Sequence, residues 1–233
     1  MLKEEIAIKK VLENPKSIFS LLKEDEKKRF MDQHMITICK KNEFIYREGD
    51  KPTSFIFLIE GKVKIFKEGI GGREQIIRMT KSLGLIGYRS LLAEELHNGS
   101  AVTLEDSLVL SVFSDFFFHT MLKNTEVCKN ILKKLAQELG FSNSRTVTLT
   151  QKHIRGRLAE SILLLKNKYG FENDGISLKA YLSREDIANL SNMTTSNAIR
   201  TLSTFAGERV ISIDGRKIKI LNLAKLQNIS KKG

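Results

Sequence analysis

The sequence predicts an α+β protein that has an N-terminal β domain, a long helix and a small C-terminal domain with a helix-turn-helix. Eight of the fifteen glycines fall between positions 49 and 99, among short runs that alternate apolar and polar residues. A seam of regularly spaced residues then starts at position 132, and two short amphipathic segments joined by a turn occupy residues 182–202. The expected domains are 1–114 for the β domain with its N-terminal helices, 115–153 for the helical region and 154–233 for the C-terminal domain.

The first 35 residues are predicted to be helical and amphipathic, because apolar residues such as Phe19 and Phe30 alternate with charged ones. From Ile36 to about Phe113 the pattern changes to short strands separated by glycine turns. Such strands predict a β-sandwich or barrel, and the chain lacks the strand-helix alternation of a parallel sheet. The expected strands cover residues 55–58, 62–66, 75–79 and 108–112.

A helical region opens at Asp115 and carries a heptad-like seam. Residues spaced alternately three and four apart suit a helix that packs on an identical helix of a second copy, and so predict a homodimer. The alternative is a helix buried on its own domain. The dimer is favoured because the helix follows a complete β domain and because DNA half-sites are usually bound by paired recognition helices. The seam comprises Leu132, Leu135, Leu139, Ser142, Thr146, Leu149 and His153, with Ser142 and Thr146 as polar exceptions that can fix the register or contact a ligand.

Gly156 is predicted to interrupt this helical run. A new helix is expected to begin at Arg157 and to continue through Lys168, with Leu158, Ile162 and Leu165 on one face. The hinge between the domains is therefore expected near residues 153–156.

Residues 182–202 predict a helix-turn-helix. Ser183 is expected to cap the first helix, with Asp186 completing a reciprocal capping pattern. Ser191-Asn192-Met193 follows as the turn, because Asn tolerates a left-handed backbone. Thr194 is expected to cap the second helix. Its inward face should comprise Ala198, Ile199, Leu202 and Phe205.

The second helix leaves short polar side chains and an Arg facing outward near its start, which suits the floor of a DNA major groove. Alternating runs 210–213 and 217–220, joined by Asp214-Gly215, predict a basic hairpin or wing directly after it. A helix-turn-helix pattern alone could be an ordinary corner of a helical protein, but the wing favours DNA binding. The candidate DNA-binding residues are Ser183, Arg184, Thr194, Thr195, Ser196, Asn197, Arg200, Arg216 and Lys217, of which Ser183 and Thr194 would serve as phosphate contacts or caps.

The C-terminal segment carries most of the net positive charge. Residues 151–233 hold 15 Lys and Arg against 7 Asp and Glu, a net charge of +8 within a total of +12. This charge suits attraction to DNA phosphates. No membrane partner is expected, because no helix there pairs a basic face with a large exposed apolar one. The sequence also shows neither a signal-peptide pattern nor an apolar stretch of membrane-spanning length, so a cytoplasmic location is expected.

Over nearly its full length the chain resembles the cyclic AMP receptor/FNR (CRP/FNR) superfamily of bacterial transcription regulators. The motifs that carry the resemblance, besides the helix-turn-helix and wing, are Tyr46-Arg47-Glu48-Gly49-Asp50, residues 57–63 and Gly84-Leu85-Ile86-Gly87. The resemblance implies a sensor jelly roll, which is a double-stranded β-helix, then a dimerisation helix and a winged helix-turn-helix domain. It also implies an inverted-repeat target in double-stranded DNA and RNA polymerase as a partner.

The chain departs from this family at the effector site. Cyclic-nucleotide binders have a Glu after the glycine and a later Arg-Ser pair that binds the phosphate, whereas this chain has Tyr88 after Gly87 and Gly99-Ser100 in place of the pair. Arg89 could supply a positive charge, but from a different backbone position. We therefore expect an effector other than cyclic AMP, or none. The candidate pocket residues are Gly87, Tyr88, Arg89, Ser90, Ser100, Ala101, Ser142 and Asn143.

Other cofactors of the family are not favoured. Two cysteines, Cys39 and Cys128, cannot supply the four thiolates of an FNR-type iron–sulfur cluster. The four histidines are scattered along the sequence, which does not favour axial ligation of haem, and no metal site is expected.

Two other classes of function compete with a transcription regulator. A cyclic-nucleotide-type regulatory module that acts on a protein partner is one, although a protein-docking helix would show a larger apolar patch than the second helix does. An enzyme is the other, but the sequence has no nucleophile elbow, zinc-protease motif or P-loop. The sequence therefore favours a non-enzymatic, dimeric DNA-binding regulator.

Overall fold

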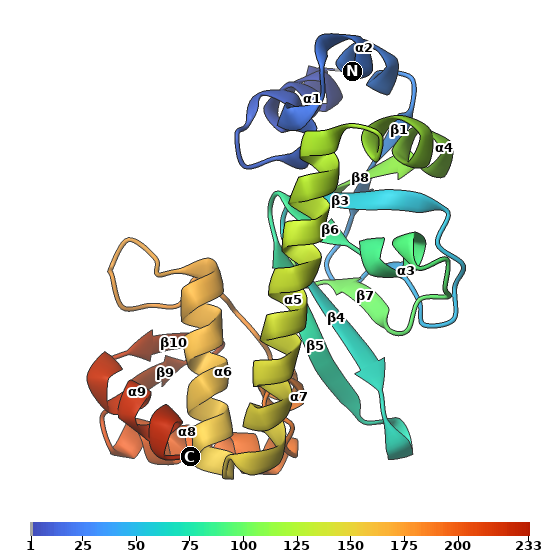
Figure 1. Cartoon of the computed structure of the whole chain (residues 1–233). Coiled ribbons are helices and arrows are strands. Elements are labelled where there is room, and N and C mark those ends of the chain that lie inside the picture. The colour runs from blue at the N-terminus through green and yellow to red at the C-terminus, as the bar shows by residue number, and fades with distance from the viewer. Residues whose placement is uncertain (1) are drawn as a thin grey trace. The chain divides into compact units, whose positions relative to one another are not determined.

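The computed structural model describes residues 2–233, with side chains described from residue 4 onward. These residues form two compact units, which are described separately below. Of the described residues, the first unit comprises 2–67 and 77–139, and the second comprises 68–76 and 140–233 (Figure 1). None of the helices in the described part of the chain is long and apolar enough to cross a membrane.

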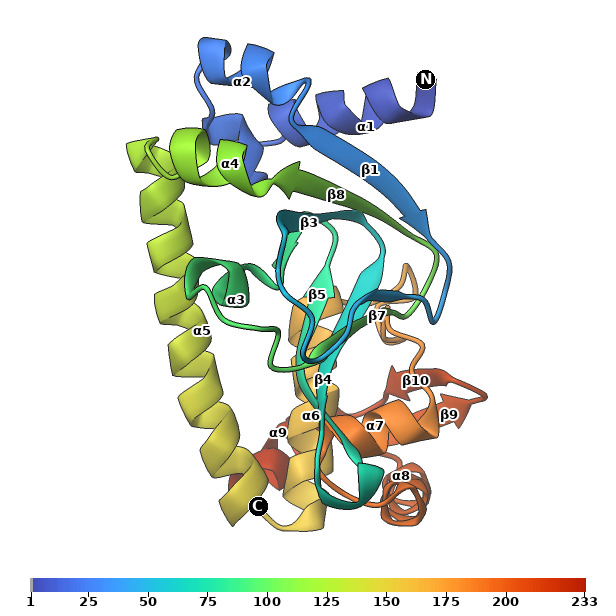
Figure 2. The same cartoon turned by 90° about the vertical axis from the view of Figure 1, so that its right-hand side faces the viewer.

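Two four-stranded sheets form the body of the first unit, which confirms the predicted jelly roll. The strand order is β1-β8-β3-β6 in one sheet and β2-β7-β4-β5 in the other, and the paired strands are antiparallel. Figure 2 shows β1 beside β8, paired in register from His34 opposite Val112 to Cys39 opposite Ser107. The strands are β1 His34–Cys39, β2 Phe44–Tyr46, β3 Ser54–Glu60, β4 Lys62–Glu68, β5 Glu74–Lys81, β6 Gly84–Ile86, β7 Ser100–Thr103 and β8 Ser107–Phe113.

Short helices flank these sheets, and aromatic side chains hold the N-terminal ones in place. The Phe19 ring is fully buried and lies 5.1 Å from the rings of Phe30 and Phe57, measured between centroids. Phe55 and Phe117 stack at 4.3 Å in the same core. The helical elements are α1 Leu2–Glu13, the 3₁₀ turns η1 Ile18–Leu21 and η2 Ile70–Gly72, α2 Glu24–Phe30, α3 Tyr88–Leu92, α4 Ser114–Phe116, a π-helical turn Phe117–Met121 and α5 Thr125–Gln151, which continues into the second unit.

The second unit has the predicted winged helix-turn-helix. Its core contains Leu158 and Ile162 from one helix, Phe205 from another and Leu226 from the last, all fully buried. In the wing, Ile213 pairs with Ile218, and Asp214 pairs with Lys217 across the turn. The elements after α5 are α6 Ile154–Tyr169, α7 Arg184–Leu190, α8 Thr195–Gly207, β9 Ile211–Asp214, β10 Lys217–Ile220 and α9 Leu223–Lys232.

The expected helix break at Gly156 is wrong. Helix α6 runs from Ile154 through Gly156, and the break between α5 and α6 falls at Lys152 and His153. A Cβ atom on Gly156 would lie 2.6 Å from the Cα and carbonyl carbon of Gly233, so only glycine lets the end of α9 approach this closely. The glycine therefore serves a contact between segments far apart in the sequence and does not end a helix.

Candidate functional site

Local hydrogen bonds fix the start of α7. The Ser183 hydroxyl accepts the backbone N–H of Asp186 at 2.9 Å, and the Asp186 carboxylate accepts the backbone N–H of Ser183 at 3.4 Å. This is the predicted capping box, which satisfies donors that the first helical turn leaves free. Ser183 therefore begins the helix-turn-helix as a cap.

The turn between α7 and α8 depends on a left-handed residue. Asn192 has φ 50°, and the backbone N–H of Met193 donates to the Ala188 carbonyl at 3.1 Å. Thr194 then caps α8, because its hydroxyl accepts the backbone N–H of Asn197 at 3.3 Å. The predicted turn and both predicted caps are confirmed.

Helix α8 buries one face and exposes the other. Ala198, Leu202 and Phe205 are buried as predicted. The prediction that Ile199 points inward is wrong, because 47% of this residue is exposed. Ile199 lies one turn after Thr195, so it shares the outer face with exposed Thr195, Ser196 and Arg200, while Asn197 is half-buried.

The wing lies against the start of α7. The Arg184 guanidinium is half-buried and donates to the Gly215 carbonyl at 2.7 Å, so it ties the first helix to the tip of the hairpin. Arg216 at this tip is exposed, and Lys217 is half-buried. The structure thus brings the helix-turn-helix and the basic wing into one unit.

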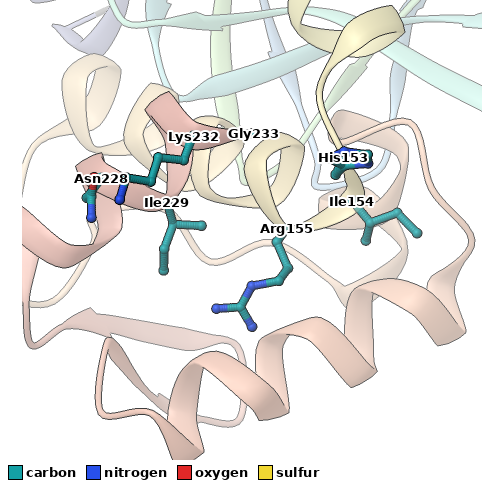
Figure 3. A pocket seen from close by; sticks show the side chains of 7 residues that line it. All are labelled: His153, Ile154, Arg155, Asn228, Ile229, Lys232 and Gly233. Carbon is teal, nitrogen blue, oxygen red and sulfur yellow. The ribbon is translucent and has the colours of Figure 1, made fainter.

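A hollow of about 580 Å³ lies between the start of α6 and the end of α9. Figure 3 shows the side chains that line it, including Arg155 and Ile154 from α6 and Ile229 and Lys232 from α9. Arg155 is already engaged, since it pairs with Glu208 at 2.9 Å and lies over the Phe205 ring. None of the lining residues belongs to the outer face of α8, so the hollow is separate from the candidate DNA-reading residues.

In the first unit, two stacked rings fill the space beside Gly87. The rings of Tyr46 and His97 are parallel, with centroids 3.6 Å apart. A Cβ atom on Gly87, whose φ is 65°, would lie 2.8 Å from an atom of each ring. Burial raises the pKa of Tyr46 to about 12. Tyr46 and His97 were not among the predicted pocket residues, because they come from distant segments and meet only in the folded chain.

Next to these rings, Tyr88 points into the protein. It is 1% exposed, and burial, together with the neighbouring Glu138 carboxylate, raises its pKa well above the usual range. Glu138 from α5 pairs with Arg78 from β5 at 2.7 Å. Side chains from α3, β5 and α5 therefore meet at the position where a cyclic-nucleotide binder is expected to hold its ligand.

Most of the remaining candidate effector residues form hydrogen bonds or ion pairs within the chain or are buried. The Ser100 hydroxyl accepts the backbone N–H of Glu48 at 3.0 Å, and Arg89 pairs with Glu95 at 2.8 Å. A Cβ atom on Gly99 would lie 2.7 Å from the Phe66 carbonyl oxygen, so this position has no room for a side chain. Ser90 and Ala101 are buried nearby, whereas Ser142 and Asn143 are exposed on the part of α5 that belongs to the second unit.

The candidate dimer seam on α5 is partly exposed. Leu132 and Leu139 are 60% and 65% exposed, while Leu135 and Leu149 are half-buried. Thr146 is exposed, and its hydroxyl donates to the Ser142 carbonyl at 3.0 Å within the helix. The helix therefore carries apolar side chains that its own chain does not cover.

Two protein-family models match this chain. Residues 37–124 match the cyclic nucleotide-binding domain, and residues 156–229 match the Crp-like helix-turn-helix domain. The chain belongs to the CRP/FNR superfamily of transcription regulators.

Relatives of this CRP/FNR regulator share about a quarter of its residues. The CRP-like cAMP-activated global transcriptional regulator of Mycobacterium tuberculosis is 24% identical over 78% of this chain and 82% of the relative. The anaerobic regulatory protein of Bacillus subtilis is 25% identical over 84% of this chain and 80% of the relative. The structure of FixK2 from Bradyrhizobium japonicum has the same fold, with a TM-score of 0.75 and 22% identity over 84% of this chain and 96% of FixK2.

Stability of the regulator should fall as the pH decreases, through His97. Burial lowers the pKa of His97; the Asp50 carboxylate opposes this shift and Arg89 adds to it. The unfolded chain therefore binds a proton more readily, so the free energy of unfolding is highest above the ordinary histidine pKa of about 6.5 and decreases below it. His97→Phe keeps a ring against Tyr46 and should make the free energy of unfolding depend less on pH. Urea unfolding at about pH 7.5 and 5.5 measures this free energy for the wild type and the variant.

Exposed His119 in the same unit provides the control. His119→Phe makes the same exchange at another histidine and so controls for the effect of the substitution itself. An unchanged decrease in His97→Phe would contradict the assignment.

Proposed function

We propose that this CRP/FNR regulator binds an inverted repeat in double-stranded DNA as a homodimer, with one α8 helix in the major groove of each half-site. The observation that carries the proposal is the outer face of α8, where exposed Thr195, Ser196 and Arg200 follow a capped helix start. Short polar side chains allow the helix to approach the base edges closely, and Arg reaches further. The net charge of +8 in residues 151–233 adds attraction to the phosphates.

The homodimer is supported by α5. Exposed Leu132 and Leu139 are seven residues apart, which is the repeat of a coiled-coil seam. A second copy of the same helix, related by a two-fold axis, would cover these side chains and present two α8 helices. Half-sites about 34 Å apart, one turn of DNA, follow from this arrangement.

Each candidate residue in the second unit then has a role. Arg200 reads guanine, and Thr195, Ser196 and Asn197 lie beside it at the base edges. Arg216 and Lys217 on the wing approach phosphates. Ser183, Thr194 and Arg184 act through the protein: the first two cap helices, and Arg184 holds the wing to α7.

For the sensor domain, we infer that cyclic AMP is not the effector. Gly99 occupies the position of the phosphate-binding Arg, and the Phe66 carbonyl leaves it no space for a side chain. Tyr88 replaces the ribose-binding Glu and is buried against Glu138 and Arg78. The chain's own side chains thus fill the site, so the effector is a different small molecule or the regulator is constitutive.

The remaining parts of the proposal concern partners and location. A regulator that reads promoter DNA acts in the cytoplasm and on RNA polymerase, without catalysing a reaction. The matched relatives named above are likewise regulators and not enzymes. Two cysteines do not supply the ligands of a four-thiolate iron–sulfur cluster, and the four histidines are scattered along the sequence, which does not favour haem.

Replacing Arg200 should relax specificity at one base pair of each half-site. Arg200→Ala removes a bidentate contact to guanine, so discrimination at that pair should fall by about 1–3 kcal/mol, or about 5- to 150-fold in relative affinity. Fluorescence anisotropy with single-base variants of the selected operator measures this. Lys179→Ala, which removes an exposed cation outside the helix-turn-helix, is the matched control and should leave discrimination unchanged. Equal weakening on all sequences by Arg200→Ala would make Arg200 a phosphate contact instead.

Cyclic AMP should not bind the purified regulator. Isothermal titration calorimetry should give no saturable heat at nucleotide concentrations up to about 1 mM, which corresponds to a binding free energy weaker than about −4 kcal/mol. The physical reason is that Gly99 and Tyr88 stand where cyclic-nucleotide binders have their phosphate-binding Arg and ribose-binding Glu, and that nearby Arg78 already pairs with Glu138. A saturable isotherm with a micromolar Kd would overturn the assignment.

A further inference from the structure

Helix α8 exposes a large apolar side chain on the same face as its polar ones. Ile199 is 47% exposed, whereas Ala198 before it is fully buried and Leu202 after it is 1% exposed. Residues three and four apart are neighbours on a helix surface, so Ile199 lies next to Ser196 and Thr195. Arg200 follows Ile199 in the sequence and lies on the same exposed face. The outer face of α8 is therefore mixed in chemistry.

Neither folding nor helix stability accounts for an isoleucine at this position. The core beneath α8 is formed by Ala198, Leu202 and Phe205, and Ile199 lies outside it with 47% of its surface exposed. Its β-branched side chain also lowers helix propensity slightly relative to leucine or a charged residue. A single exposed apolar residue is common on protein surfaces, but this one lies within the face that follows the Thr194 cap.

The chemistry of the major groove indicates what such a side chain can recognise. Each base pair presents hydrogen-bond donors and acceptors there, and thymine alone adds an apolar group, its C5 methyl. Isoleucine has no hydrogen-bonding group, so it favours the methyl over any other edge. We propose that Ile199 contacts the C5 methyl of a thymine in each half-site and specifies that base pair, next to the pair that Arg200 reads.

This inference rests on the proposed function, because it requires α8 to lie in the major groove. A protein partner docked on Ile199 fits the surface less well. Its neighbours on the outer face are Thr195, Ser196 and Arg200, so the apolar area does not extend into a patch. The positive charge of the domain also favours a nucleic acid over a protein.

The test removes single methyl groups from the DNA. An operator is first selected from random duplexes by the wild-type protein, and each thymine of both half-sites is then replaced in turn by uracil, which lacks only the C5 methyl. Fluorescence anisotropy gives the Kd for wild type, Ile199→Ala and Ile176→Ala. The last variant truncates an isoleucine in the same unit that is 39% exposed and lies outside the helix-turn-helix, so it is the matched control.

At one thymine position, uracil in both half-sites should weaken wild-type binding by about 10- to 20-fold, from the burial of roughly one methyl group in each half-site. Ile176→Ala should show the same sensitivity, and Ile199→Ala should bind the thymine and uracil operators equally. Equal sensitivity in Ile199→Ala, or no sensitive thymine in the wild type, would overturn the inference while leaving DNA reading intact. Failure of the wild type to select any sequence would instead overturn the proposed function and, with it, the role of Ile199.

Discussion

The DNA-binding unit depends on the backbone of one residue, Asn192. Its φ of 50° turns the chain sharply enough for α7 and α8 to share a core, with Ile187 and Leu190 of the first helix buried. Asparagine adopts this left-handed conformation at less cost than most residues. Once the turn is formed, Thr194 caps α8. The start of the helix then determines which of its residues are exposed.

The sensor unit shows a different kind of constraint. Its residues 37–124 match a cyclic nucleotide-binding domain, and around the start of α3 the stacked rings of Tyr46 and His97 lie beside Gly87, while buried Tyr88 lies near the Arg78–Glu138 ion pair. The proposal that cyclic AMP is not the effector rests on two replacements, Tyr88 for the ribose-binding Glu and Gly99 for the phosphate-binding Arg.

Features fixed by neighbours in the sequence were predictable, and features fixed by distant contacts were not. The capping box at Ser183, the turn at Asn192 and the β-rich character of residues 36–113 all follow from local patterns. Gly156 was predicted to break a helix, because the residue that requires a glycine there, Gly233, lies far along the chain. Ile199 fitted the apolar period of α8, and only the packing of the unit shows that it faces outward.

The proposed function requires that the regulator reads a two-fold DNA sequence and needs no cyclic nucleotide to do so. Selection of random duplexes by the purified, ligand-free protein at about physiological salt measures both properties at once. We expect enrichment of an inverted repeat with half-site centres about one helical turn apart. Equal retention of all sequences would contradict the account, because it would show a basic protein that binds phosphates without reading bases.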